Sequence, residues 1–317
     1  MRYILAFILA FIIVYLIMPI LMKLSLKYNF TDKPTKRKNH RGEIPLCGGI
    51  GMFIGFFIVY LIINNNTSVT EKMWVFISAS LILIIGLADD YYKAHGKEFP
   101  IYPRLIIQLL AAALIFKAGI AFRGFTNPFT GEYITLNPII QFLLTITWIF
   151  GVTTVINWSD GMDGLAGGLS FISAITFAGV ALILGQSESI IMSLIVSGIV
   201  VGFLMYNKYP AKIFMGDSGA NFLGFLLSII ALDGAFKQAT VMSLFIPILA
   251  LAVPIFDNIF VILKRFSEGK PVYQADRSQI HYRLEAKGFS IKQVVTYINI
   301  ISLAFSIISI ILLLIKK

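Results

Sequence analysis

Charged side chains, cysteine and histidine are all scarce in this chain of 317 residues. Asp, Glu, Lys and Arg together make up 13% of it, about half their share in an ordinary soluble domain, so a soluble globular enzyme is not expected. The single cysteine, Cys47, excludes a disulfide within the chain and a cysteine-based metal site. Three scattered histidines argue against zinc, whose usual ligands are missing. The short alternating segments of a membrane β-barrel are missing too.

Long apolar runs are what the chain has in abundance. Of its residues 58% are hydrophobic, and the runs are about 18–24 residues long, the length of membrane-spanning helices. We expect an all-α, polytopic membrane protein that forms one domain over residues 1–317, and no cleavage site marks the first run as a signal peptide. Ten spans are predicted, roughly at residues 3–22, 47–63, 73–90, 104–122, 139–157, 168–185, 189–206, 219–236, 240–263 and 293–315.

Lysine and arginine are distributed unevenly over the connections between these spans. The connections 23–46, 91–104 and 264–292, with Lys208 and Lys212, hold 19 of them, and the other side of the membrane, with both termini, holds 7. Because basic residues are retained in the cytoplasm, this split predicts cytoplasmic odd-numbered connections and two extracytoplasmic termini.

Five aspartates gather at the predicted cytoplasmic ends of the spans. Asp89 and Asp90 close the third span, Asp160 and Asp163 follow the fifth, and Asp217 precedes the eighth. Helix ends at an interface can carry charge at low cost, but ordinary cytoplasmic ends are enriched in Lys and Arg. The clustering therefore favours a functional site on this face.

The segment 157–168 is the most informative of these. Asn157, Asp160 and Asp163 are spaced three apart and share one broad face if the helix continues. Four glycines beside them leave room for a bulky phosphate to approach the backbone. An EF-hand is a poor match, because the ligand ladder and the closing Glu are absent. A simple helix-packing turn would leave the aspartates unexplained.

Asp217 stands between glycines at the expected start of a helix. The string Gly-Asp-Ser-Gly at 216–219 is similar to the nucleophile segment of trypsin-like proteases, but neither their barrel nor a suitable His–Asp pair is available here. A carboxylate at a helix N-terminus suits a metal or anion site better. Oxygen ligands without cysteine select a hard cation such as Mg²⁺ or Mn²⁺.

The basic segments 32–40 and 274–283 exceed what topology requires, although topology alone accounts equally well for several of the lysines at 23–38. Together with the acids they indicate a Mg²⁺-bound, multiply anionic substrate. Nucleic acid is not expected as a partner, because the chain has no soluble binding module. Asp257, in the ninth span after Pro254, is either a functional intramembrane acid or a partner in a structural hydrogen bond.

These motifs, in this order, resemble the polyprenyl-phosphate N-acetylhexosamine-1-phosphate transferase family over nearly the whole chain. The motifs that carry the resemblance lie at 32–34, 44–49, 89–90, 104–108, 157–164, 207–219 and 254–257. The segment 275–281 resembles the branch that starts teichoic acid, common-antigen and related wall polymers. The muramyl-pentapeptide branch, whose histidine-rich loop has a different frame, is the alternative within the family.

The resemblance implies an enzyme of the bacterial inner membrane with its active site at the cytoplasmic face. Its substrates would be a UDP-N-acetylhexosamine, with UDP-N-acetylglucosamine expected, and undecaprenyl phosphate in the bilayer. The products would be the undecaprenyl-diphosphate sugar and UMP. The resemblance also implies a Mg²⁺ cofactor, which Mn²⁺ can replace, and suggests a homodimer.

The family motifs further imply roles for individual residues. Asp217 would bind Mg²⁺ with Asn157 nearby, Asp89 and Asp90 would contact the lipid phosphate or the metal, and Asp160 and Asp163 would line the nucleotide-sugar pocket. The residues implied to bind substrate are Arg104, Asn207, Arg277, His281 and Arg283.

One departure from the family concerns its His-Ile-His-His string, which is Gln279-Ile-His-Tyr282 here. Only the middle histidine remains, which leaves the identity of the sugar open. His281 can become cationic near neutral pH, unlike Gln279 and Tyr282, and we expect donor binding to rest on His281 and the neighbouring arginines.

A transporter is the alternative from a different class of protein. An ion-coupled carrier could use Asp257 and broken helices, but such carriers place their sites near the membrane midplane and often contain repeats. Here the acids gather at one face, and the sequence contains no visible repeat.

Overall fold

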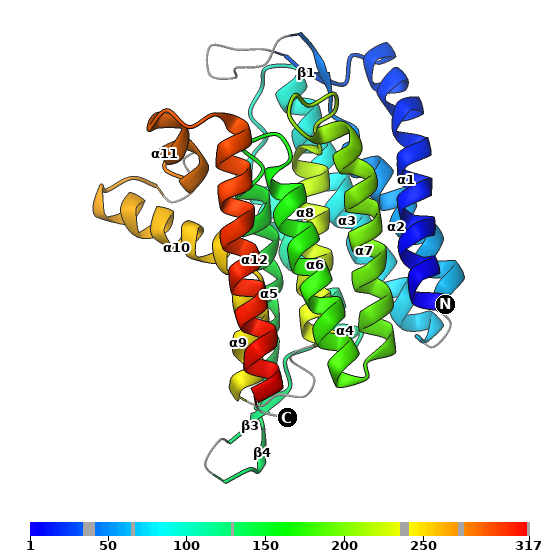
Figure 1. Cartoon of the computed structure of the whole chain (residues 1–317), viewed down its shortest axis with the longest axis vertical. Coiled ribbons are helices and arrows are strands. Elements are labelled where there is room, and N and C mark those ends of the chain that lie inside the picture. Colours follow the sequence, from blue (N-terminus) through cyan, green and yellow to red (C-terminus); the bar gives the residue numbers. More distant parts are fainter. Residues whose placement is uncertain (34–41, 65–66, 128–129, 235–240, 272–275, 316–317) are drawn as a thin grey trace.

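The computed structural model describes residues 1–33, 42–64, 67–127, 130–234, 241–271 and 276–315, with the backbone alone at 241–244. These parts are almost entirely helical (Figure 1). The helices are α1 (Arg2–Lys27), α2 (Gly48–Ile63), α3 (Val69–Ala94), α4 (Ile101–Lys117), α5 (Pro138–Trp158), α6 (Leu165–Leu184), α7 (Ser187–Asn207), α8 (Gly216–Asp233), α9 (Val241–Ala250), α10 (Ala252–Ser267), α11 (Ile280–Ala286) and α12 (Ile291–Ile315).

Two small antiparallel pairs of strands join helices. β1 (Thr31–Asp32) pairs with β2 (Ile44–Pro45) with Thr31 opposite Pro45, between α1 and α2. β3 (Gly124–Thr126) pairs with β4 (Tyr133–Thr135) with Phe125 opposite Ile134, between α4 and α5. Figure 1 shows that the two pairs lie at opposite ends of the bundle, and that α1 begins and α12 ends toward the β3–β4 end.

Six helices in the described parts are long and apolar enough to cross a membrane: α1, α3, α5, α6, α7 and α12. The outer helices have the surface expected in lipid. On α1 the buried residues Ala6, Ala10, Val14 and Met18 form one stripe with a spacing of four, while large apolar side chains such as Leu16 and Ile20 are exposed. Because lipid rather than water tolerates such a surface, the all-α, polytopic membrane architecture predicted from the sequence is confirmed.

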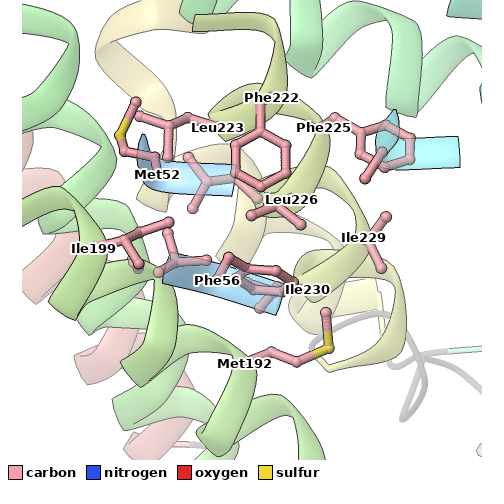
Figure 2. Packing of buried hydrophobic residues seen from close by; sticks show 14 of the residues in the cluster. Met52, Phe56, Met192, Ile199, Phe222, Leu223, Phe225, Leu226, Ile229 and Ile230 are labelled. Atoms are coloured by element: carbon pink, nitrogen blue, oxygen red, sulfur yellow. The ribbon is translucent and has the colours of Figure 1, made fainter. Parts of the chain in front are cut away.

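The central helix is α8, whose residues from Ser218 to Leu232 are all buried. Figure 2 shows Phe222 and Leu226 of α8 beside Phe56 of α2. Glycine allows α3 to approach α8 closely, because a Cβ atom on Gly86 would lie 2.4 Å from the Cα of Ser218. This close approach brings the C-terminal end of α3 to the first turn of α8.

The ninth predicted span, 240–263, is wrong as a single helix. The chain forms α9 and α10 instead, and Leu251 between them departs from helical geometry with φ −113° and ψ 20°. Pro254 explains the break, because it has no N–H to donate to the carbonyl four residues earlier. Figure 1 shows α10 leaving the bundle and running toward α11.

Candidate active site

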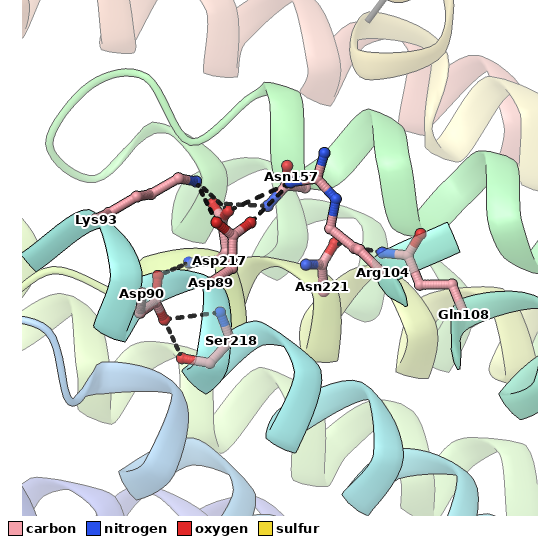
Figure 3. Close-up of polar contacts among 9 residues, drawn as sticks. All are labelled: Asp89, Asp90, Lys93, Arg104, Gln108, Asn157, Asp217, Ser218 and Asn221. Carbon is pink, nitrogen blue, oxygen red and sulfur yellow. Dashed lines mark hydrogen bonds and ion pairs between the residues drawn. The ribbon is translucent and has the colours of Figure 1, made fainter. Parts of the chain in front are cut away.

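Asp217, in the first turn of α8, collects polar side chains from three other helices (Figure 3). Asn157 at the end of α5 donates its Nδ2–H to Asp217 Oδ1 at 3.2 Å. Lys93 near the end of α3 donates to Asp217 Oδ2, and Arg104 Nη1 from α4 lies 3.8 Å from the same oxygen. Segments separated by more than a hundred residues therefore meet at one carboxylate.

Asp89 is the second carboxylate of this cluster. Arg104 Nη1 lies 2.7 Å from Asp89 Oδ2, and Lys93 Nζ lies 3.4 Å from Oδ1. The Asp89 side chain is 2% exposed, whereas those of Lys93 and Arg104 are 44% and 31% exposed. Two cations thus bridge two carboxylates and remain accessible to an incoming anion.

Lys93 was not among the predicted site residues, because it was counted only as a topology signal. The signal that could have found it is its spacing of four from Asp89, which places both side chains on one face of α3. Gln108, one turn further along α4 than Arg104, donates to Asn221 Oδ1 of α8 at 3.3 Å. This hydrogen bond joins the helix that carries Arg104 to the helix that carries Asp217.

Asp90 faces a different set of partners from its neighbour Asp89. It is 2% exposed and accepts hydrogen bonds from the backbone N–H groups of Asp217 and Ser218, at 2.7 and 3.0 Å, and from Ser218 Oγ at 2.7 Å. These are donors of the first turn of α8, where a negative charge also stabilises the helix. Asp90 therefore fixes the start of the helix that carries Asp217.

Asp163 and Asn207 hold the turn between α5 and α6 in place. Asp163 Oδ2 accepts from the N–H of Ala211 at 2.9 Å. The Asn207 amide accepts from the N–H of Gly164 at 2.9 Å and donates to the carbonyl of Ile213 at 2.8 Å. Both polar atoms of this buried side chain are bonded to the backbone, so the geometry of Asn207 is that of a positioning residue and not of a substrate ligand.

Asp160 lies in the same turn, with an electrostatic environment that disfavours a negative charge. Burial, followed by the charges of Asp217, Asp90 and Asp163, raises the pKa of Asp160 to about 8. Its carboxyl group is therefore largely protonated near neutral pH unless a cation is added nearby.

The predicted basic ligands Arg277 and Arg283 are paired with acids near α11. Arg283 Nη2 donates to Asp257 Oδ1 at 2.8 Å, and Asp257 also accepts from the N–H of Ile280. Arg277 Nη2 donates to Glu285 Oε2 at 2.8 Å. Of the two roles left open for Asp257, the geometry is that of the structural hydrogen bond. Gln274 and Ala275, like residues 34–40 of the other basic segment, lie outside the described residues.

His281 is buried against the turn that carries Asp160. It is 1% exposed, and a Cβ atom on Gly161 would lie 2.1 Å from its Nε2. Burial, followed by the charges of Arg277 and Arg283, lowers the pKa of His281 to about 4. Burial thus disfavours the positive charge that the sequence allowed for His281 near neutral pH, and its role in donor binding stays a prediction.

The donor chemistry of the cluster fits a hard divalent cation that is shared with a substrate. The carboxyl groups of Asp89, Asp90 and Asp217 outnumber the two cations Lys93 and Arg104. The described residues contain no group of three or more His, Cys, Asp or Glu side chains arranged around one metal position. Asp217 and Asp89 offer two carboxylates beside the Asn157 amide, and Mg²⁺ is commonly held by one or two carboxylates plus substrate phosphates.

Comparison with known proteins adds an independent finding. Residues 73–235 match the model of glycosyl transferase family 4. The chain is 38% identical to a probable undecaprenyl-phosphate N-acetylglucosaminyl 1-phosphate transferase of Bacillus subtilis, over 98% of this chain and 85% of the relative. It is 28% identical to an undecaprenyl-phosphate alpha-N-acetylglucosaminyl 1-phosphate transferase of Yersinia pestis, over 90% and 77%. It is 33% identical to a phospho-N-acetylmuramoyl-pentapeptide-transferase of Prochlorococcus marinus, over 81% and 74%.

Proposed function

The chain belongs to glycosyl transferase family 4, and from this premise we propose that it transfers N-acetylglucosamine 1-phosphate from UDP-N-acetylglucosamine to undecaprenyl phosphate and releases UMP. The product starts a cell-wall or surface polymer. The observation that carries the proposal is the pair of carboxylates, Asp89 and Asp217, bridged by Lys93 and Arg104 where four helix ends meet.

The electrostatics of the reaction suit this cluster. A phosphomonoester has a second pKa of about 6, so the lipid phosphate is mostly ionised at neutral pH and needs no strong base. Its oxygen attacks the β-phosphorus of the donor, the bond from that phosphorus to the bridging oxygen breaks, and UMP leaves with the electron pair. The main barrier is repulsion between two anions, which positive groups at fixed positions reduce.

Each part of the cluster then has a task. Asp217, Asp89 and Asn157 would hold Mg²⁺, or Mn²⁺ in its place, and the bound ion would neutralise charge on the donor diphosphate. Lys93 and Arg104, which are partly exposed, contact the phosphates of the two substrates. Asp160, whose pKa is raised to about 8 by burial and by nearby carboxylates, lines the nucleotide-sugar pocket as a neutral group or as a partner of the added cation.

The membrane arrangement belongs to the same proposal. We place ten crossings in the bacterial inner membrane, the ninth made of α9 and α10, with the active site at the cytoplasmic face and both termini outside the cytoplasm. The charge split between the connections supports this orientation. The whole chain forms one transferase domain, and a homodimer remains a prediction from the family.

The donor can be tested against the alternatives with purified protein. UMP release is measured with UDP-N-acetylglucosamine, UDP-N-acetylgalactosamine or UDP-N-acetylmuramoyl-pentapeptide, each with and without undecaprenyl phosphate. We expect release that requires the lipid and is fastest with UDP-N-acetylglucosamine. Preference for the pentapeptide donor would assign the chain to the muramyl branch. A protein that releases no UMP with any donor would contradict the transferase proposal and favour the alternative of an ion-coupled transporter.

A further inference from the structure

Arg265, at the end of α10, is a buried arginine that the proposed reaction does not use. It is 2% exposed. Its Nη2 lies 2.8 Å from Asp276 Oδ1 and its Nε lies 3.3 Å from Oδ2, so the guanidinium binds the carboxylate with two parallel hydrogen bonds. Its Cζ also lies 4.9 Å from the ring centroid of Trp158, within the range of a cation–π interaction. Such a planar, two-sided arrangement is specific to arginine.

Asp276 connects Arg265 to the residues just before α11. Its carboxylate also accepts from the N–H of Ser278 at 3.1 Å and from Ser278 Oγ at 2.9 Å. Mainly through the hydrogen bonds of Arg265, the pKa of Asp276 is lowered to about 2, so the ion pair persists at neutral pH. Two residues after Ser278, the N–H of Ile280 is held by Asp257. The position of α11 is therefore fixed on both sides of Gln279.

Both ends of this chain of contacts reach the active-site cluster. Trp158 directly follows Asn157, which donates to Asp217. At the other end His281 of α11 lies against Gly161, the neighbour of Asp160. The contacts run from Trp158 through Arg265, Asp276 and α11 back to the turn from which they started. Moving Arg265 would therefore shift both the turn and the helix packed against it.

We propose that Arg265 is a positioning residue for the donor side of the active site, because it joins Trp158 to Asp276 and so holds His281 against the Asp160–Gly161 turn. The proposal rests on the transferase function proposed above. It assigns no substrate contact to Arg265 itself. Asp89 and Arg104, which form their own ion pair, take part in none of these contacts.

The test combines kinetics with hydrogen exchange on the full-length protein in detergent. We expect Arg265→Met to lower kcat/KM for UDP-N-acetylglucosamine by about tenfold to 100-fold, since a displacement of about 1 Å can cost 10²-fold, while KM for undecaprenyl phosphate stays within about twofold. Arg265→Lys keeps the charge without the two-sided geometry and should fall between Met and wild type. In Arg265→Met the amides of residues 277–286 should exchange faster than in wild type, whatever the activity.

A matched control is Lys270→Met, which removes an exposed ion pair with Glu268 from the same segment and should leave all these measurements within twofold of wild type. If Arg265→Met does not fold, Asp276→Asn and Arg265→Lys carry the same test with almost unchanged volume. Unchanged exchange over 277–286, or faster exchange with unchanged donor kinetics, would overturn the proposal. Failure of the transferase proposal gives a different result: the wild-type protein itself would release no UMP, whereas the hydrogen exchange of Arg265→Met could still be compared with that of wild type.

Discussion

Asp89 and Asp90 are neighbours in sequence, and their different partners predict different consequences of mutation. Asp90 accepts three hydrogen bonds from the first turn of α8. In Asp90→Asn one oxygen becomes an amide group that donates and cannot accept, so at least one of these donors in the first turn of α8 loses its partner. An unsatisfied buried donor costs about 1–3 kcal/mol, and hydrogen bonds to a charged group are worth about 1.5–3 kcal/mol. We expect Asp90→Asn to lower the free energy of unfolding by about 2–3 kcal/mol.

Asp89→Asn is the matched comparison. Its partners Lys93 and Arg104 are partly exposed and both also face Asp217, so the cations left behind can be solvated. We expect Asp89→Asn to change the free energy of unfolding by no more than about 1 kcal/mol, but to reduce turnover by about 10²-fold, as removal of one preorganised electrostatic group does. Ser218→Ala, which removes only one of the three donors to Asp90, should cost about 1 kcal/mol.

Thermal unfolding in detergent at one fixed scan rate, followed by tryptophan fluorescence, measures the stability effect, and UMP release measures turnover. The melting temperature should be highest for the wild type, slightly lower for Asp89→Asn and lowest for Asp90→Asn. The reasoning would be refuted by an Asp90→Asn protein that melts with wild type and yet loses as much activity as Asp89→Asn. That result would mean that Asp90 contacts the substrate or the metal directly.

Four further predictions follow from the site and the membrane arrangement. Asp217→Asn should lose at least about 10²-fold in turnover, and wild-type activity removed by a chelator should return with Mg²⁺ or Mn²⁺ but not with Zn²⁺; near-normal turnover of the variant would remove Asp217 from the metal site. Burial lowers the pKa of His281 to about 4, so the neutral side chain contributes its full stability above pH 6.5, and this contribution, about 3 kcal/mol at most, is lost as the pH falls toward 4. Between pH 6.5 and 4.5 the melting temperature of the wild type should therefore fall more than that of His281→Gln. Equal falls in the two proteins would contradict the lowered pKa. Gly161→Ala places a Cβ atom 2.1 Å from His281 Nε2 and should reduce donor use by about tenfold, with a smaller effect of the same change in a His281→Ala background; equal effects in both backgrounds would argue against the contact. Single cysteines near each terminus should react with a membrane-impermeant reagent in intact cells, and reaction only after the membrane is opened would reverse the proposed orientation.

Sequence reasoning could find the acids of the site because they stand at the ends of apolar runs. Asp89 and Asn157 close predicted spans and Asp217 precedes one. Because successive spans cross the membrane in opposite directions, these three ends lie on the same face. The sequence did not reveal that Asp89 and Asp90 have different partners. Successive helix positions point about 100° apart, and only the packing of the helices decides what each side chain contacts. Asp90 therefore shared the prediction made for Asp89.

What sequence reasoning missed depends on burial and on contacts between distant segments. The break at Leu251 had a visible cause in Pro254, yet the apolar run through residues 240–263 outweighed it. The neutral state of His281 required knowledge that the side chain is 1% exposed. Arg265 and Lys93 were counted as topology signals, because a basic residue after a span looks the same in sequence whether it faces solvent, pairs with a carboxylate or packs on a tryptophan.

The central claim, transfer of the sugar together with its phosphate, is tested most directly with UDP-N-acetylglucosamine that carries ³²P at the β-phosphorus. After incubation with the purified protein and undecaprenyl phosphate, lipid and aqueous products are separated and counted. We predict that the label moves into the lipid fraction while unlabelled UMP appears in equal amount, and that Asp217→Asn abolishes both. Label that stays in the aqueous phase as UDP, with unlabelled sugar on the lipid, would contradict the account.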